Sequence, residues 1–242
     1  MQFAFMTDKG IVRSSNEDSC EAGAFNDEYA WGIVCDGMGG ALAGEVASKT
    51  ALEFISERIQ NGYHRDMTPL SAQYLLRSAV IAAGIIVHDD SCKEREHYGM
   101  GTTVVAAIVL KDCIVCAYVG DSRAYIADKN GIIRITHDHS LVQERIDAGL
   151  ITEEEARYAP DRNIITRVLG VEESVDVDIV TVPFTRKDKL LICSDGLTNM
   201  LSEQRIWQML KDGNVNDLPS ELIQSANQAG GRDNISVVVI EK

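Results

Sequence analysis

Three apolar stretches of this chain each end at an aspartate that lies beside a glycine. The three junctions are Asp36-Gly37, Gly120-Asp121 and Asp195-Gly196. A fourth acid, Asp233, lies just before the apolar stretch 235–240. One such junction carries little information, because Asp and Gly are common turn residues. Four of them indicate a shared acidic site, since unpaired carboxylates at the edge of an apolar core are costly and divalent cations would neutralise them.

A further group of polar residues lies near the N-terminus, ahead of another strand-like stretch. The segment Arg13-Ser14-Ser15-Asn16-Glu17-Asp18 adds two acids and one arginine. Carboxylates and backbone carbonyls are hard oxygen ligands that suit Mg²⁺ or Mn²⁺, whereas zinc sites are built mainly from His and Cys. The guanidinium of Arg13 has the planar fork that binds phosphate oxygens in a bidentate way. A lone arginine is more often a surface ion-pair partner, and that alternative stays open.

Together these residues predict hydrolysis at phosphorus. Two divalent ions held about 3.5–4 Å apart by a bridging carboxylate lower the pKa of a shared water and stabilise an in-line displacement. The sequence contains neither a Gly-x-Ser-x-Gly elbow nor a Cys-x5-Arg loop, so no covalent nucleophile is indicated. Water is therefore the expected attacking group.

The composition is that of an ordinary soluble globular protein. Of 242 residues, 45% are hydrophobic and 25% are charged, and no linker or composition shift marks a boundary. We therefore expect one domain over residues 1–242. The formal charge of −14, from 23 basic and 37 acidic residues, repels nucleic acid, and no basic patch is visible. We expect a monomer that does not bind nucleic acid.

Neither a membrane span nor an export signal is expected. The longest apolar runs, 78–87 and 100–110, are shorter than the roughly 18 to 20 residues that cross a bilayer. The N-terminus lacks a basic leader followed by an apolar core. These observations predict a cytoplasmic protein without membrane insertion.

All six cysteines are interpreted as reduced core residues. Most lie within strand-like runs, where cysteine behaves as a small apolar residue; they are Cys20, Cys35, Cys92, Cys113, Cys116 and Cys193. Cys113 and Cys116 have the spacing of a zinc or redox pair. If that stretch is a strand, residues three apart point to opposite faces, so the pair is not expected to share a metal or a disulfide.

Strand-like apolar runs dominate the chain. They occur at 3–6, 29–35, 102–110, 113–119, 124–127, 132–135, 175–182, 189–193 and 235–240. Short links at 111–112 and 128–131 predict hairpins and mainly antiparallel pairing. Helical periodicity occurs at 46–59 and 70–87, and again around 206–210 and 218–226. Strands in blocks with helices in pairs predict two packed sheets covered on both outer faces by helices.

The stretch 141–159 is polar and helical in pattern, and it lies between strands. Thr152 and Glu155 form a capping-box pattern that predicts the start of a short helix. We expect a helical flap insertion at about 141–170 that could act as a lid beside the acidic edge. A solvated helical connector is the simpler interpretation, and the sequence alone favours it.

Seven motifs in this order resemble those of the bacterial PP2C-type, metal-dependent (PPM) serine/threonine phosphatases. Each is weak alone, but together they cover nearly the whole chain. They are Arg13-x-x-Asn16-Glu17-Asp18, Asp36-Gly37-Met38-Gly39-Gly40, Gly101-Thr102-Thr103, Gly120-Asp121-Ser122-Arg123, Asp138-His139-Ser140, Ser194-Asp195-Gly196-Leu197 and Gly231-Arg232-Asp233-Asn234.

The resemblance implies an α+β fold, a four-layer α/β/β/α sandwich of two mainly antiparallel sheets with a metal centre at one end. Asp36 then resembles the carboxylate that bridges two Mn²⁺ or Mg²⁺ ions, with the carbonyl of Gly37 on one ion. Asp195 and Asp233 match ligands of the other ion.

The remaining roles follow from the same resemblance. Asp121, with Asp195, matches the position of a third, weaker metal, and Arg13 matches the arginine that binds the substrate phosphate. Glu17 and Asp18 resemble outer-shell groups that hold metal-bound waters. Asn234 is expected to orient the Asp233 loop, and a structural role is favoured for it.

One position departs from many eukaryotic members of that family. They carry a histidine after the Asp-Gly pair that is thought to protonate the leaving alkoxide, whereas this chain has Met38. His137 and His139 are available in the sequence, but histidines at strand ends are more often structural. A metal-bound water is the preferred proton donor.

The resemblance implies an enzyme, a phosphoric monoester hydrolase that cleaves phosphoserine and phosphothreonine in one step with a hydroxide bridging two ions. Its implied partners are phosphorylated proteins and a cognate bacterial serine/threonine kinase; some members act in sporulation or sigma-factor circuits. Two rivals are a pseudophosphatase, which would have replaced Asp36, Asp195 or Asp233, and a structural Ca²⁺-binding protein. The second does not account for Arg13, and no EF-hand loop is present.

Overall fold

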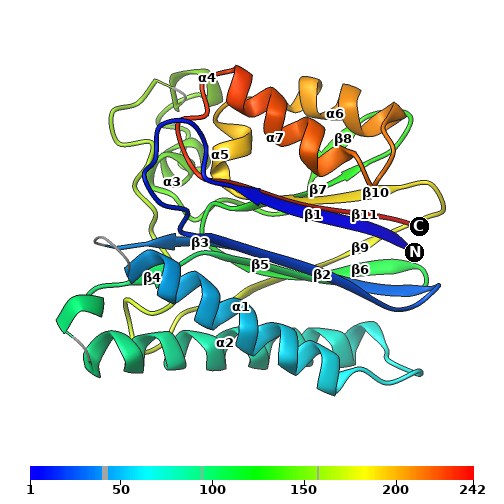
Figure 1. Ribbon diagram of the computed structural model, residues 1–242, viewed down its shortest axis with the longest axis horizontal. Coiled ribbons are helices and arrows are strands. Elements are labelled where there is room, and N and C mark those ends of the chain that lie inside the picture. Colours follow the sequence, from blue (N-terminus) through cyan, green and yellow to red (C-terminus); the bar gives the residue numbers. More distant parts are fainter. Residues whose placement is uncertain (40–42, 94, 157) are drawn as a thin grey trace.

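Four layers make up the computed structural model, which describes residues 1–39, 43–93, 95–156 and 158–242. Two antiparallel sheets lie face to face at its centre, and helices cover both outer faces (Figure 1). The helices are α1 (Ala43–Gly62), α2 (Pro69–Lys93), α3 (Leu141–Asp147), α4 (Glu153–Ala156), α5 (Asp195–Thr198), α6 (Glu203–Asp212) and α7 (Leu218–Gln228), with a 3-10 turn η1 (Arg95–His97). The predicted α/β/β/α sandwich is confirmed.

The first sheet has the order β1-β11-β10-β7-β8, and all its pairs are antiparallel. Its strands are β1 (Gln2–Asp8), β11 (Ile235–Glu241), β10 (Lys189–Cys193), β7 (Arg123–Ala127) and β8 (Ile132–Arg134). Helices α5, α6 and α7 cover its outer face (Figure 1).

The second sheet has the order β2-β3-β5-β6-β9, again antiparallel throughout. Its strands are β2 (Asp18–Asn26), β3 (Tyr29–Met38), β5 (Val104–Val109), β6 (Cys113–Val119) and β9 (Asp178–Pro183), and β4 (Gly101–Thr102) pairs with the end of β3. Helices α1 and α2 cover its outer face.

Two of these strands differ from the sequence prediction. The run 102–110 is interrupted at Thr103, whose N–H donates to the carbonyl of Asp36 and leaves the ladder. The sequence indicates β2 only as a strand-like stretch, because its residues are small or polar and show weak apolar alternation. Both predicted hairpins, β5–β6 and β7–β8, are confirmed.

Three apolar clusters fill the spaces between layers. One lies between α1/α2 and the second sheet, one between the two sheets, and one between the first sheet and α6/α7. Cys113 packs toward the first of these clusters and Cys116 toward the second, which confirms that they lie on opposite faces of β6. The prediction that every cysteine is a core residue is wrong for Cys92, which is exposed near the end of α2.

Helix α2 is long and apolar enough to span a membrane by length and composition alone. In this fold it lies along β6, β5, β9 and α1. Its buried side chains, which include Leu76, Val80 and Val87, belong to the cluster beneath the second sheet. Its apolar character is thus explained by its packing against the second sheet and α1.

The segment 141–170 contains α3 and α4, as its helical pattern predicted, and Arg157 lies outside the described residues. The capping box is confirmed: Thr152 Oγ1 accepts a hydrogen bond from the N–H of Glu155, and Glu155 Oε2 accepts one from the N–H of Thr152. Isolated bridges Ser140↔Ile165 and Thr102↔Leu169 fix the segment at both ends. Its action as a lid stays a prediction.

Candidate metal centre

The predicted acids come from separate elements of both sheets. Asp18 begins β2 and lies directly opposite Asp36 of β3 in the ladder. Asp121 follows β6 on the way to β7, Asp195 begins α5 directly after β10, and Asp233 precedes β11. Two like charges opposite each other on neighbouring strands are destabilising, so the Asp18–Asp36 pair alone already favours a counter-ion.

Electrostatics shows that these acids share one environment. Burial raises the pKa of Asp36 well above its ordinary value, and the carboxylates of Asp18, Asp195, Asp121 and Asp233 raise that pKa further. Each of the four neighbours therefore lies close enough to disfavour the charge on Asp36. The fold gathers these four acids around Asp36.

Three other acids are perturbed for the same reasons. Burial, and then the charge of neighbouring acids, raises the pKa of Asp18 to about 7, of Asp121 to about 7 and of Asp195 to about 6. Burial also raises the pKa of Glu17. A site that disfavours so many carboxylate charges is suited to a cation of high charge.

Two buried carboxylate oxygens support that fit. Asp18 Oδ1 and Asp121 Oδ1 are buried and have no hydrogen-bond partner among the described residues. Gly37 lies so tightly against the carbonyls of Glu17 and Gly44 that no Cβ would fit there. The donor set of buried carboxylates suits Mg²⁺ or Mn²⁺.

In the described part of the chain, no three His, Cys, Asp or Glu side chains are grouped so as to hold one ion among them. This spacing does not disfavour Mg²⁺, which keeps several waters and is usually bound by one or two carboxylates. The residues fit a site in which each ion takes few carboxylates, a backbone carbonyl such as that of Gly37, and water. Gly40, the end of the Asp36 motif, lies outside the described residues.

Asn234 holds the two chain segments of the site together. Its Nδ2 donates to the carbonyls of Lys9 (2.9 Å) and Ser15 (2.8 Å), and its Oδ1 accepts from the N–H of Glu17 (2.8 Å). Its own N–H donates to Asp233 Oδ1 at 2.9 Å. The buried amide therefore fixes the 9–17 loop relative to Asp233, which agrees with the structural role expected for it.

A serine relay that the sequence did not reveal connects the sheets. Ser194 Oγ donates to Asp18 Oδ2 at 2.7 Å and accepts from the N–H of Ser236 at 2.9 Å. Asn199 was also missed, although its Nδ2 donates to Asp195 Oδ2 at 2.9 Å. Its position four residues after Asp195 was the available signal, because such pairs meet on one helical face.

The Gly-Thr-Thr and Gly-Asp-Ser motifs support the backbone of Asp36. Its N–H donates to Thr103 Oγ1 (3.1 Å), and its carbonyl accepts from Thr102 Oγ1 (3.0 Å). Thr103 Oγ1 in turn lies 2.8 Å from Ser122 Oγ, beside Asp121. These contacts give Thr102, Thr103 and Ser122 a structural role, and they link the positions of Asp36 and Asp121.

Arg13 lies at this centre, as expected, and makes an ion pair there. Its Nη2 is 2.8 Å from Asp233 Oδ2, and its side chain is 53% exposed. The hydrogen bond from Arg13 to Asp233, together with the charges of Asp233, Glu17 and Asp36, raises the pKa of Arg13 against its burial. The guanidinium is thus held at the edge of the acidic site. Its ion-pair partner is Asp233, which is itself one of the acids of that site.

Neither candidate histidine reaches the centre. His139 Nδ1 accepts from the N–H of Gly120 at 3.1 Å, and its Nε2 faces Asp178 at 3.1 Å. Burial lowers the pKa of His139. His137 Nε2 pairs with Asp147 on the exposed side at 2.7 Å. Both are structural, as expected, and Met38 supplies no proton.

The known proteins that this chain resembles are protein phosphatases. A family model described as protein phosphatase 2C matches residues 11–221. The serine/threonine phosphatase stp of Listeria welshimeri is 40% identical over 100% of this chain and 96% of its own length.

Two solved structures are similar in fold as well. The serine/threonine phosphatase Stp1 from Staphylococcus aureus superposes with a TM-score of 0.92 at 35% identity, over 100% of this chain and 95% of that one. The catalytic domain of the phosphatase PstP in complex with two manganese ions gives a TM-score of 0.86 at 32% identity, over 98% of this chain and 96% of that one.

Proposed function

We propose, because the chain belongs to the protein phosphatase 2C family, that its acidic centre hydrolyses phosphoserine and phosphothreonine in proteins. Relatives that match the chain over its whole length are serine/threonine phosphatases. The chemistry of the family depends on metal ions, and one structure of similar fold contains two manganese ions.

The assignment of residues is part of this proposal. Asp36 would hold two Mn²⁺ or Mg²⁺ ions, one of them with help from the carbonyl of Gly37. Asp195 and Asp233 would hold the second ion. Asp121 would hold a third, more weakly bound ion. When bound, such ions lower the pKa of water and stabilise charge at phosphorus. The hydroxyl groups of Thr102 and Thr103 hold the backbone of Asp36 in place.

Arg13 is proposed to bind the phosphate. Its guanidinium carries five donors in a planar fork, of which Nη2 engages Asp233. The exposed side chain presents its remaining donors at the mouth of the site. Glu17 and Asp18 are proposed to orient waters; Ser194 fixes Asp18 Oδ2 and leaves Oδ1 for that purpose.

One observation carries this proposal: the carboxylates of Asp18, Asp121, Asp195 and Asp233, which come from different elements, all raise the pKa of the buried Asp36. Two buried oxygens of this group, Asp18 Oδ1 and Asp121 Oδ1, have no partner among the described residues. A pseudophosphatase is disfavoured because Asp36, Asp195 and Asp233 are all present and gathered. We further propose a monomeric cytoplasmic enzyme without membrane insertion that acts on phosphorylated proteins and opposes a cognate serine/threonine kinase.

The test is hydrolysis of para-nitrophenyl phosphate and of a phosphothreonine peptide after chelation, with and without added Mn²⁺. Wild-type protein should be inactive when metal-free and active with Mn²⁺. Asp36→Asn should stay inactive with Mn²⁺, whereas Asp66→Asn, an exposed acid remote from the site, should behave as wild type. Turnover in a fully chelated sample, or none with metal, would refute the proposal.

A further inference from the structure

Strand β1 has an open edge. It pairs with β11, and no strand in the described part of the chain lies on its other side. Phe5 and Met6 of this strand are 43% and 40% exposed. An edge strand with unpaired N–H and C=O groups is a template for another chain, and proteins usually protect it with a short length, charges, proline or a bulge.

The other three described sheet edges have such protection. Strand β8 is only three residues long, β2 has a bulge between Ala24 and Asn26, and β9 begins at Asp178 and ends at Pro183. Strand β1 has seven residues and neither charge nor proline before Asp8. Its edge is thus left open over a length that could pair with a short extended peptide.

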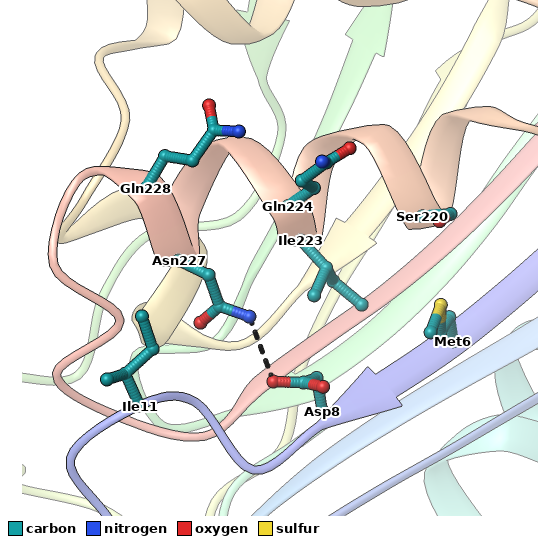
Figure 2. Close-up of a pocket in the computed structure, with 8 residues that line it drawn as sticks. All are labelled: Met6, Asp8, Ile11, Ser220, Ile223, Gln224, Asn227 and Gln228. Carbon is teal, nitrogen blue, oxygen red and sulfur yellow. Dashed lines mark hydrogen bonds between the residues drawn. The ribbon is translucent and has the colours of Figure 1, made fainter.

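A groove accompanies this open edge. It has a volume of about 550 Å³ and lies between β1 and α7. Figure 2 shows Met6 and Asp8 on one wall and Ile223 and Asn227 on the other, with Ile11 near one end. The arrangement of an edge strand beside a helix offers both a backbone ladder and a place for alternate side chains.

One end of the groove reaches the turn that carries Arg13. The N–H of Ile11 donates to the carbonyl of Gly231 at 2.8 Å, two residues before Asp233. Gly10 is packed against the carbonyl of Asp233 with a φ of +78°, so no other residue fits there without strain. The groove therefore ends beside the loops that carry Arg13 and Asp233.

Charge defines what the groove can accept. Asp8 is the one charged residue among its described lining residues. Its Oδ1 accepts from Asn227 Nδ2 and from the N–H of Gly10, which fixes an acidic group in the groove. The chain as a whole carries a charge of −14. A basic segment is attracted to this surface, whereas a second copy of the chain is repelled.

We propose that an extended segment of the phosphoprotein substrate, with alternating basic and apolar residues, pairs with the free edge of β1 and fills this groove. The inference rests on the proposed phosphatase function, because it makes the groove an extension of the catalytic centre. Backbone hydrogen bonds to β1 provide affinity, and the apolar and acidic walls select the side chains.

The experiment compares phosphothreonine peptides that carry an extension of alternating lysine and valine with peptides in which glutamate replaces lysine. The extension is placed on either side of the phosphothreonine in turn. Wild type should favour the lysine peptide by about tenfold in kcat/KM. Met6→Lys and Gln224→Lys should abolish this preference and leave para-nitrophenyl phosphate kinetics unchanged. Ile133→Lys, on the edge strand β8 of the same sheet, is the matched control and should retain it.

Docking is also measured without catalysis, by fluorescence anisotropy of the labelled, unphosphorylated lysine peptide. A version with alternate amides N-methylated should bind about tenfold more weakly, because it cannot donate to β1. If the enzyme proves inactive on para-nitrophenyl phosphate, the proposed function fails while this measurement still decides docking. Equal binding by Met6→Lys, no saturable binding by wild type, or self-association through β1 in place of peptide binding would each overturn the inference.

Discussion

Removal of the Asn234 amide should loosen the metal centre without touching a proposed ligand. Asn234→Ala deletes three side-chain hydrogen bonds, to Lys9, Ser15 and Glu17. At about 1 kcal/mol for each bond, the free energy of unfolding should fall by about 3 kcal/mol. For a chain of this size, that corresponds to a decrease in Tm of roughly 6 to 12 °C.

The same change should weaken metal binding, because the amide fixes the 9–17 loop against Asp233. Loss of such a supporting contact typically costs about 10- to 100-fold in metal affinity. Asn234→Asp should be worse than alanine, since its carboxylate would face the carbonyls of Lys9 and Ser15 and could not donate to them.

Two measurements check this prediction: calorimetric unfolding of the chelated protein and titration with Mn²⁺. Asn216→Ala serves as the matched control, because Asn216 is exposed in the loop before α7. A Tm and an Mn²⁺ affinity for Asn234→Ala within error of that control would refute the role of the amide as the clamp between the two segments. Equal effects of alanine and aspartate would refute the hydrogen-bond reasoning.

Two further predictions concern Arg13 and the site acids. Arg13→Ala should lower kcat/KM about 100-fold and leave Mn²⁺ affinity unchanged or higher, because the variant removes a cation that competes for Asp233. Arg13→Lys should have an intermediate kcat/KM. If Arg13→Ala has wild-type kinetics, the only remaining role of Arg13 is its ion pair with Asp233. For the metal-free protein, acids with a raised pKa stabilise the fold at low pH and lose that contribution as pH rises through the folded value, about 7 for Asp18 and Asp121. Its Tm should therefore rise as the pH is lowered from about 8 to about 6.5. Below this window, protonation of the buried His139 opposes the trend. Asp18→Asn should flatten this slope, and an unchanged slope would contradict the assignment.

The positions of the acids were predictable because each marks the end of an apolar run. Asp36 lies near the end of β3, and Asp121, Asp195 and Asp233 lie close to the ends of β6, β10 and β11. Antiparallel pairing brings such strand ends together. Strand β2 was weaker in sequence because its small and polar residues show little alternation. A strand of this kind is defined by the neighbour it pairs with more than by its own residues.

The hydrogen bonds that support the site acids could not be predicted from the sequence. Ser194 and Asp18 are separated by 176 residues, and Asn234 and Ser15 by 219. Hydrogen bonds of this kind depend on the register between sheets, which no local pattern encodes. Asn199 is the exception, since its helical spacing from Asp195 was visible. Cys92 was wrongly predicted to be buried because cysteine is usually a buried residue. The polar residues around it, Asp89, Asp90 and Lys93, mark an exposed end of α2.

The arrangement of the first sheet has a consequence for biosynthesis. Strand β1 is synthesised before its partner β11, which follows more than two hundred residues later, so a growing polypeptide exposes both edges of β1 until β11 has been made. Asp233 and Asn234 arrive with the same late segment. On the proposed assignment of Asp233, the nascent chain stays inactive until this segment has been made. The interval before β11 emerges is when β1 most needs a chaperone's protection.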